Sequence, residues 1–236
     1  MIIGPGITIG GGIFVDSNAL TTSLVTSGMT LNLDAGNASS YPGSGDTWFD
    51  LSDYEADVTL YNNPVFNTVP PKYLDFNGSS QYGVASKSGI LSATSYSKSA
   101  WFFWRGYGTN NNIVSGSGGG HFMFGAAQNK IFCGHSDWSN YIAFPSITTI
   151  DLFTWYYATL TFDTTNGMSL YINGILDNTY DAVKTGLPGN GSIEIASFAG
   201  SNLLYGALGK VHCYDRALSA SEVLQNFNAT KAEYGY

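Results

Sequence analysis

At 236 residues, with 44% hydrophobic and 11% charged residues, the chain is long enough for one sizeable core, and one main domain with a short arm is expected. The formal net charge of −8 and the lack of a basic stripe argue against nucleic acid and membrane surfaces as partners. No apolar run approaches the roughly 20 residues that span a bilayer, and no signal-peptide pattern is visible, so synthesis in a cytoplasm is expected.

Residues 1–27 are rich in glycine and β-branched residues and carry no charge before Asp16. So many glycines prevent this segment from folding a core alone, yet its apolar side chains would be unfavourable in a solvated linker. We therefore expect an extended N-terminal arm that pairs with its own domain's sheet or, by strand addition, with a neighbouring subunit. The apolar residues assigned to this assembly arm are Ile2, Ile3, Ile7, Ile9, Ile13 and Phe14.

The domain proper is expected to occupy residues 28–236. Leu31 and Leu33 alternate with polar residues, as in a half-buried strand. Residues 96–104 form the densest aromatic segment and are apolar on both faces, which predicts a strand in the centre of a sandwich. Short strands are expected at 121–124 and 130–135.

Residues 155–180 predict a meander of three strands. Its second turn contains Asn173 and Gly174, the strongest hairpin signal in the chain, because both central positions of a type I′ turn require positive φ. Each strand of the meander should therefore pair with the next one along the chain.

The end of the chain changes from strand to helix. A glycine-containing strand stops at Tyr214, and Ser219 is followed three residues later by Glu222. This spacing predicts a capping box that opens a short amphipathic helix. One helix should thus close an otherwise all-β chain.

This ending resembles the close of laminin-G-like domains of the concanavalin A-like lectin/glucanase class. Three earlier runs, at 31–52, 76–82 and 155–174, are similar to motifs of that class and occur in the same order. The resemblance implies a two-sheet antiparallel β-sandwich, a concanavalin A-like jelly roll with a short C-terminal helix. In the second run, Asn77 and Gln81 replace carboxylates that are common in the class, which weakens any calcium site carried over to that turn.

The run 31–52 is similar to laminin-G-like modules of tailed-bacteriophage structural proteins. The resemblance implies a non-enzymatic virion protein, either a capsid decoration or a tail-fibre subunit. Such a protein would be a homo-oligomer and would contact other virion proteins through its arm. It would be located in the virion after synthesis in the host cytoplasm.

The alternative function is a carbohydrate-binding lectin module that acts mainly through a sugar site. Exposed aromatic rings beside amides and carboxylates stack on sugars and bind hydroxyl groups, and two loops have that content. Packing over the sandwich rim, or into a subunit contact, remains the other interpretation of Trp138. Host surface polysaccharide is a candidate partner in either case. The candidate glycan-binding residues are Tyr107, Asn110, Asn111, Asp137, Trp138 and Tyr141.

Enzymatic activity is not expected. Glycanases of this fold use paired carboxylates, and this chain has four glutamates. Glu55 and Glu233 fall in expected loop or tail. Glu222 is explained by capping, and Glu194 has no acidic residue two or four positions away. The catalytic carboxylate strand of related glucanases is therefore missing from the pattern.

No cofactor is expected apart from a candidate calcium ion. Laminin-G-like domains often hold calcium at a loop edge, and Asp163, Asn173 and Asp177 are available at the meander. These side chains could equally form turns without a metal. Cys133 and Cys213 are expected to be buried thiols rather than a disulfide. His121, His135 and His212 have no metal-binding spacing, and His212 is expected to face solvent or a polar seam.

Overall fold

The computed structural model describes residues 23–106, 111–116, 121–126, 129–136, 141–182 and 192–236. Nearly all of the predicted arm precedes residue 23, so its assigned side chains lie outside the described residues: Ile2, Ile3, Ile7, Ile9, Ile13 and Phe14. Within the described part, no helix is long and apolar enough to cross a membrane.

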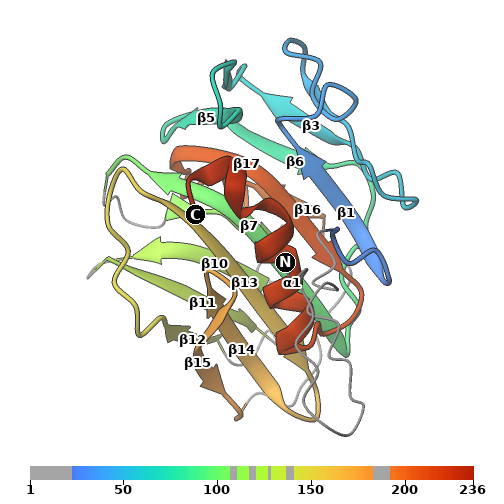
Figure 1. Ribbon diagram of the computed structural model, residues 1–236, viewed down its shortest axis with the longest axis vertical. Coiled ribbons are helices and arrows are strands. Elements are labelled where there is room, and N and C mark those ends of the chain that lie inside the picture. The colour runs from blue at the N-terminus through green and yellow to red at the C-terminus, as the bar shows by residue number, and fades with distance from the viewer. Residues whose placement is uncertain (1–22, 107–110, 117–120, 127–128, 137–140, 183–191) are drawn as a thin grey trace, which may run out of the picture.

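The largest sheet has eight strands and forms one layer of the molecule (Figure 1). Its order is β15-β14-β13-β7-β17-β5-β4, and β1 also pairs with β17. All these pairs are antiparallel. The strands are β1 (Met29–Asp34), β4 (Val65–Asn67), β5 (Tyr73–Asn77), β7 (Ser95–Trp104), β13 (Trp155–Asp163), β14 (Gly167–Ile172), β15 (Ile175–Tyr180) and β17 (Tyr205–Tyr214).

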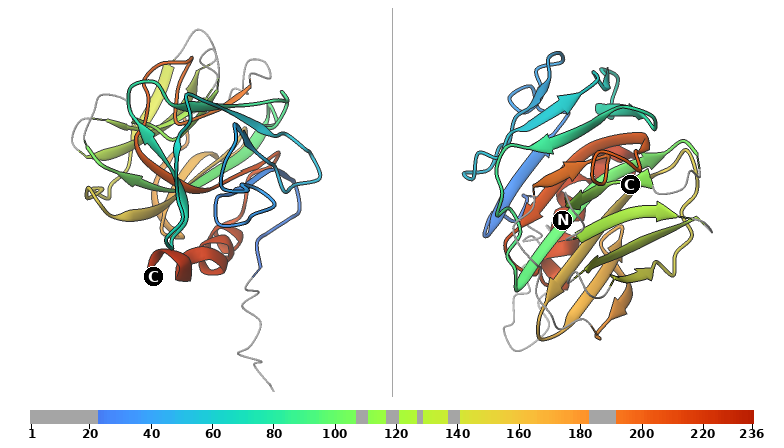
Figure 2. Two further views of the ribbon diagram at one scale, coloured as in Figure 1. Left: turned by 90° about the horizontal axis from the view of Figure 1, so that it is seen from above. Right: turned by 180° about the vertical axis from the view of Figure 1, so that it is seen from behind.

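Two smaller antiparallel sheets form the second layer (Figure 2). A hydrogen bond from the Ile113 N–H to the Met123 carbonyl joins them. One sheet contains β2 (Thr47–Trp48), β3 (Val58–Tyr61), β6 (Tyr82–Ala85), β16 (Ile193–Ile195) and β9 (Val114–Gly116). The other contains β12 (Tyr141–Pro145), β11 (Lys130–Ser136), β10 (His121–Ala126) and β8 (Asn111–Asn112). The predicted all-β sandwich with a jelly-roll-like fold is confirmed.

The aromatic strand β7 lies in the middle of the large sheet, between β13 and β17. Its inward face places Phe102 and Trp104 in the main core. On its outward face, Trp101 is fully buried in a separate cluster with residues of the C-terminal helix. Because both faces are covered, the strand is apolar on both sides, as the sequence predicted.

A charged side chain lies in the main core at a position where an apolar one would be expected. Lys98 lies on the inward face of β7, is fully buried, and donates a hydrogen bond to the Val114 carbonyl at 3.0 Å. Burial lowers the pKa of its amine to about 7. Cys213 is its cross-strand partner. Cys213 and Cys133 are both buried and free of disulfide bonds, as expected.

The C-terminal helix α1 (Ala220–Thr230) lies on the outer face of the large sheet (Figures 1 and 2). The predicted capping box is present, because the Ser219 side chain accepts from the Glu222 N–H and the Glu222 side chain accepts from the Ser219 N–H. A 3₁₀ helix, η1 (Lys231–Tyr234), follows. Residues 23–27, which we assigned to the arm, also contact α1: the Val25 N–H donates to Asn226 at 2.8 Å.

Of the two surroundings predicted for His212, solvent is wrong, because the side chain is fully buried. Its Nδ1 lies 3.4 Å from the Tyr157 hydroxyl. Burial lowers its pKa to about 4. His135 is buried as well, with Nδ1 3.3 Å from the Tyr96 hydroxyl, so it is not a surface histidine. The side chain of His121 lies outside the described part.

Candidate functional site

Most predicted glycan-binding residues cannot be placed. Tyr107, Asn110, Asp137 and Trp138 lie outside the described residues, and of Tyr141 only the backbone, at the start of β12, is described. Their role in binding sugar stays a prediction.

The side chain of Asn111, which lies in the described part of the chain, has a structural role. It is 2% exposed, its amide nitrogen donates to the Gly106 carbonyl at 2.9 Å, and its Oδ1 accepts from the Tyr205 N–H at 2.8 Å. Its placement as a direct sugar contact is therefore corrected, because both ends of the amide are already engaged inside the protein. Its hydrogen bonds instead position the backbone of Gly106 and Tyr205.

The three candidate calcium ligands do not converge. Asp163 caps the turn between β13 and β14, accepting from the Asn166 N–H at 2.7 Å. Asn173 lies at the other end of the six-residue strand β14, roughly 20 Å away at the usual strand rise. Asp177 accepts from the N–H groups of Ile147 and Thr148 at 2.6 and 2.9 Å. The structure thus contradicts a shared calcium site made of these residues.

The predicted hairpin explains the position of Asn173. Asn173 and Gly174 have φ values of 53° and 78°, as a type I′ turn requires. The Asn173 Oδ1 accepts from the Tyr157 N–H at 2.9 Å. Within the described residues, no group of three or more histidine, cysteine, aspartate or glutamate side chains could hold a metal ion.

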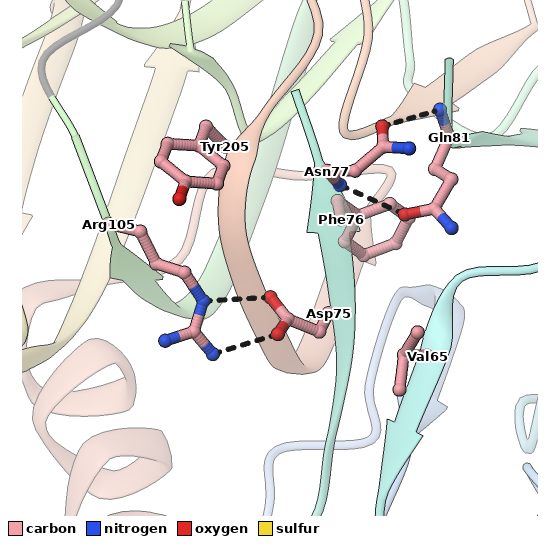
Figure 3. Close-up of a pocket in the computed structure, with 7 residues that line it drawn as sticks. All are labelled: Val65, Asp75, Phe76, Asn77, Gln81, Arg105 and Tyr205. Carbon is pink, nitrogen blue, oxygen red and sulfur yellow. Dashed lines mark hydrogen bonds and ion pairs between the residues drawn. The ribbon is translucent and has the colours of Figure 1, made fainter. Parts of the chain in front are cut away.

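A surface pocket of about 440 Å³ lies on the outer face of the large sheet, at the corner formed by β4, β5, β17 and the end of β7 (Figure 3). This volume is within the range of ligand sites. Alternation along β5 explains its lining: Leu74 and Phe76 are buried, whereas Asp75 and Asn77 alternate with them and point outward. The lining residues are Val65, Asp75, Phe76, Asn77, Gln81, Arg105 and Tyr205.

Strand register brings these residues together. Tyr205 on β17 is directly opposite Asn77 on β5, and Val65 on β4 is opposite Asp75. The Arg105 N–H donates to the Tyr205 carbonyl at 3.0 Å, which continues the pairing past the end of β7. Four neighbouring segments of the sheet therefore each contribute one wall.

Asp75 and Arg105 form a two-point ion pair in this pocket (Figure 3). Nε and Nη2 of Arg105 donate to the two carboxylate oxygens of Asp75 at 3.0 and 2.9 Å. These hydrogen bonds raise the pKa of the Arg105 guanidinium further above its usual value. The guanidinium carbon also lies 5.1 Å from the centre of the Phe103 ring, so a cation–π contact holds it from behind.

Tyr205 is the exposed aromatic ring of the pocket, with 46% of its surface accessible. Two glycines make room for it. A Cβ at Gly78 would lie 2.7 Å from the Tyr205 Cβ, and one at Gly106 would lie 3.1 Å from its ring. Gly78 also has a φ of 69°, a conformation that favours glycine. The ring is thus held by its backbone surroundings and open on its outer side.

The turn beside the pocket is closed by amides instead of carboxylates. Asn77 Oδ1 accepts from the Ser79 and Ser80 N–H groups at 2.9 and 3.0 Å. Gln81 Oε1 accepts from the Asn77 N–H at 2.9 Å, and its amide nitrogen donates to the Asn63 carbonyl at 2.7 Å. Asn77 and Gln81, which replace carboxylates common in the class, therefore supply the hydrogen bonds that hold this turn.

Sequence spacing does not predict this pocket, because its residues come from segments up to 140 positions apart, from 65 to 205. The signals that were available are local. Asp75 and Asn77 alternate with apolar residues on β5, and Arg105 is a charge placed directly after an aromatic strand. The candidates Tyr107 and Asn110 follow Gly106 in the sequence.

The fold and the surface pocket define a class, that of β-sandwich proteins built from facing antiparallel sheets. The family model of the concanavalin A-like lectin/glucanases superfamily matches residues 77–224, more than half of the chain. The chain belongs to this superfamily. No curated protein sequence matches it.

Solved structures with the same fold include three from bacterial toxins. A structure of botulinum neurotoxin type C, described with two ganglioside molecules, has a TM-score of 0.68 and 15% identity. The binding domain of botulinum neurotoxin DC in complex with rat synaptotagmin II and the binding domain of Paraclostridial Mosquitocidal Protein 1 each have a TM-score of 0.68 and 16% identity. Each match covers 86% of this chain but 52% of the other chain, so the present chain spans about half their length.

Proposed function

We propose that the chain is a carbohydrate-binding, lectin-like module whose sugar site is the pocket around Tyr205. The observation that carries the proposal is an exposed aromatic ring fixed beside a carboxylate and a guanidinium group. Aromatic faces stack on the apolar faces of sugar rings, and fixed polar groups at the pocket wall bind hydroxyl groups. The module acts by binding and not by catalysis, since Asp75 is the sole carboxylate that lines the described pocket and it is paired with Arg105.

Two comparisons support this proposal. Membership of a lectin and glucanase superfamily makes a sugar ligand the natural candidate. Among the proteins with a similar fold, the cell entry of botulinum neurotoxin type C depends on interaction with two ganglioside molecules, and gangliosides are glycolipids. Because fold does not determine function, the chemistry of the pocket is the main support for the proposal.

Replacing Tyr205 with alanine is expected to weaken glycan binding at least about tenfold, because the stacking surface is removed, and a loss of ~1.4 kcal/mol has that effect. The binding should be measured by screening the protein on neutral and acidic oligosaccharides and then titrating the best one. Tyr61→Ala is the matched control, since Tyr61 is also an exposed tyrosine, 42% accessible, but lies on β3 of the second layer. Equal binding by the wild type and Tyr205→Ala would refute this site.

We also propose that the module serves as a virion structural protein, a surface decoration or fibre subunit of a tailed phage. The resemblance of residues 31–52 and the apolar composition of the arm support this role. The arm would then dock the module on other virion proteins and promote homo-oligomer formation, while the outer face of the sandwich meets the host glycan. The virion would be its site of action.

Deleting residues 1–14 is expected to leave a folded domain but to abolish oligomer formation and attachment to particles. The reason is that contacts such as Val25 to Asn226, which anchor the described start of the chain on α1, remain intact. Light scattering after size-exclusion chromatography and copurification with particles measure the two effects. A truncated protein that still assembles and attaches would show that the arm has no such role.

A further inference from the structure

We infer that the pocket selects uncharged glycans and binds them without a bridging cation. This inference rests on the proposed function and adds the chemical class of its ligand. The deciding feature is the Asp75–Arg105 ion pair, which neutralises the charge of the pocket while leaving hydrogen-bonding capacity on both partners.

The charges of the described pocket lining cancel each other. Among the described residues that line the pocket, Asp75 is the sole carboxylate and Arg105 the sole cation, and the two are joined by two hydrogen bonds of 3.0 and 2.9 Å. The other lining side chains are amides, a tyrosine and apolar groups. The described lining therefore has a formal charge of zero, and an anionic sugar finds no unpaired positive charge there.

An anionic sugar would also have to displace Asp75 to reach the Nε and Nη2 face of Arg105. The displaced carboxylate, without its partner, would remain beside the anion and repel it. A chain with a net charge of −8 adds to this repulsion. A carboxylate on a sugar is therefore expected to bind in this pocket less favourably than an uncharged hydroxyl group.

The described residues of the pocket do not suit a bound calcium ion. Calcium in proteins is bound by several oxygen ligands, with carboxylates supplying the charge. The carboxylate of Asp75 is already neutralised by Arg105, and the amides of Asn77 and Gln81 are used within the adjoining turn. The described pocket therefore offers a cation a single carboxylate whose charge is already balanced, so recognition of the sugar proceeds through the ion pair itself.

The Asp75–Arg105 ion pair keeps hydrogen-bonding atoms that a sugar can use. Each oxygen of Asp75 accepts one hydrogen bond from Arg105 and keeps a second lone pair. Nη1 of Arg105 donates to no described residue. An acceptor on Asp75 and a donor on Arg105 therefore lie in one pocket with the Tyr205 ring (Figure 3). Two adjacent hydroxyl groups of a sugar ring match this arrangement, because each hydroxyl both donates and accepts.

The wild-type protein provides the first test. Neutral polysaccharides such as dextran and mannan should bind more tightly than alginate and polysialic acid, which carry carboxylates. Binding should change less than about twofold between about 0.05 M and about 0.5 M salt, because no net charge is neutralised. An excess of EDTA should leave it unchanged. Preference for the acidic polymers, or loss of binding in EDTA, would overturn the inference while leaving a glycan-binding function intact.

Asp75→Asn provides the second test. Removal of the carboxylate exposes the guanidinium of Arg105, so the variant should gain affinity for alginate or polysialic acid by about tenfold, in a salt-dependent way. Asp53→Asn is the matched control, because it makes the same change in net charge at an exposed position that does not line the pocket. An unchanged specificity in Asp75→Asn, with folding confirmed by circular dichroism, would contradict the inference.

If this variant fails to fold, the salt and EDTA measurements on the wild type still decide. Failure of the wild type to bind any saccharide would refute the proposed function as well.

Discussion

Lys98→Met is expected to stabilise the protein by several kcal/mol at pH 6 to 7, and by progressively less as the pH rises towards 10. Lys98 is fully buried in the sandwich core, and burial lowers the pKa of its amine to about 7. In the unfolded chain the pKa of a lysine is about 10.4. Between these values the unfolded state binds more protons, so the wild type gains stability as the pH increases.

The apolar methionine removes this dependence and the cost of desolvating the amine. It also leaves the Val114 carbonyl without its donor, which offsets about 1 to 3 kcal/mol of the gain. Urea unfolding of both proteins from pH 6 to 9 measures the difference. Burial raises the pKa values of Cys133 and Cys213 to about 12, against the effect of the nearby Lys98 amine, so the comparison is read below pH 8.5, where unfolded thiols are still mostly protonated. Lys72→Met, at an exposed lysine, is the control. A variant less stable than the wild type at pH 6 would contradict the account of Lys98.

Trp101→Ala is expected to destabilise the protein by about 3 to 5 kcal/mol, the usual cost of removing a buried tryptophan. Its ring stacks on Tyr234 with centroids 4.1 Å apart, and its Nε1 donates to the Thr230 hydroxyl at 2.8 Å. Both partners belong to the C-terminal helices, so the substitution should also loosen their attachment to the sheet. Urea unfolding gives the stability, and limited proteolysis after residue 218 reports on the attachment.

The matched control for this prediction is Phe153→Ala, because Phe153 is an aromatic residue that is 63% exposed. Its effect should stay within about 0.5 kcal/mol. If Trp101→Ala were as mild as this control, the helices would be held on by other contacts, and the outward face of β7 would have no structural importance.

The features that could be predicted from the sequence are those that depend on nearby residues. The capping box needs Ser219 and Glu222 three positions apart, and the type I′ turn needs Asn173 next to Gly174. The central place of β7 was predictable because both of its faces are apolar from Ala100 to Trp104. In each case one short segment contains the whole physical cause.

The features that could not be predicted depend on which strands become neighbours. Asn111 has the composition of a sugar-binding loop residue, but the position of β17 turns its amide inward to the Tyr205 N–H. His212 shares its strand face with the polar residues Lys210 and Tyr214, and its burial becomes visible only when α1 is placed over the sheet. Asp75 and Arg105 are 30 residues apart, and only the sheet order brings them together. Sequence spacing alone does not contain this information.

The central claim, that the Tyr205 pocket is the sugar site, is tested most directly by following backbone amide signals in NMR spectra during titration with a bound neutral saccharide. The account predicts that the largest shifts occur at Tyr205, Arg105 and Asn77, which line the pocket. They should saturate together with a single dissociation constant. Shifts confined to residues 136–141, with Tyr205 and its neighbours unmoved, would contradict it.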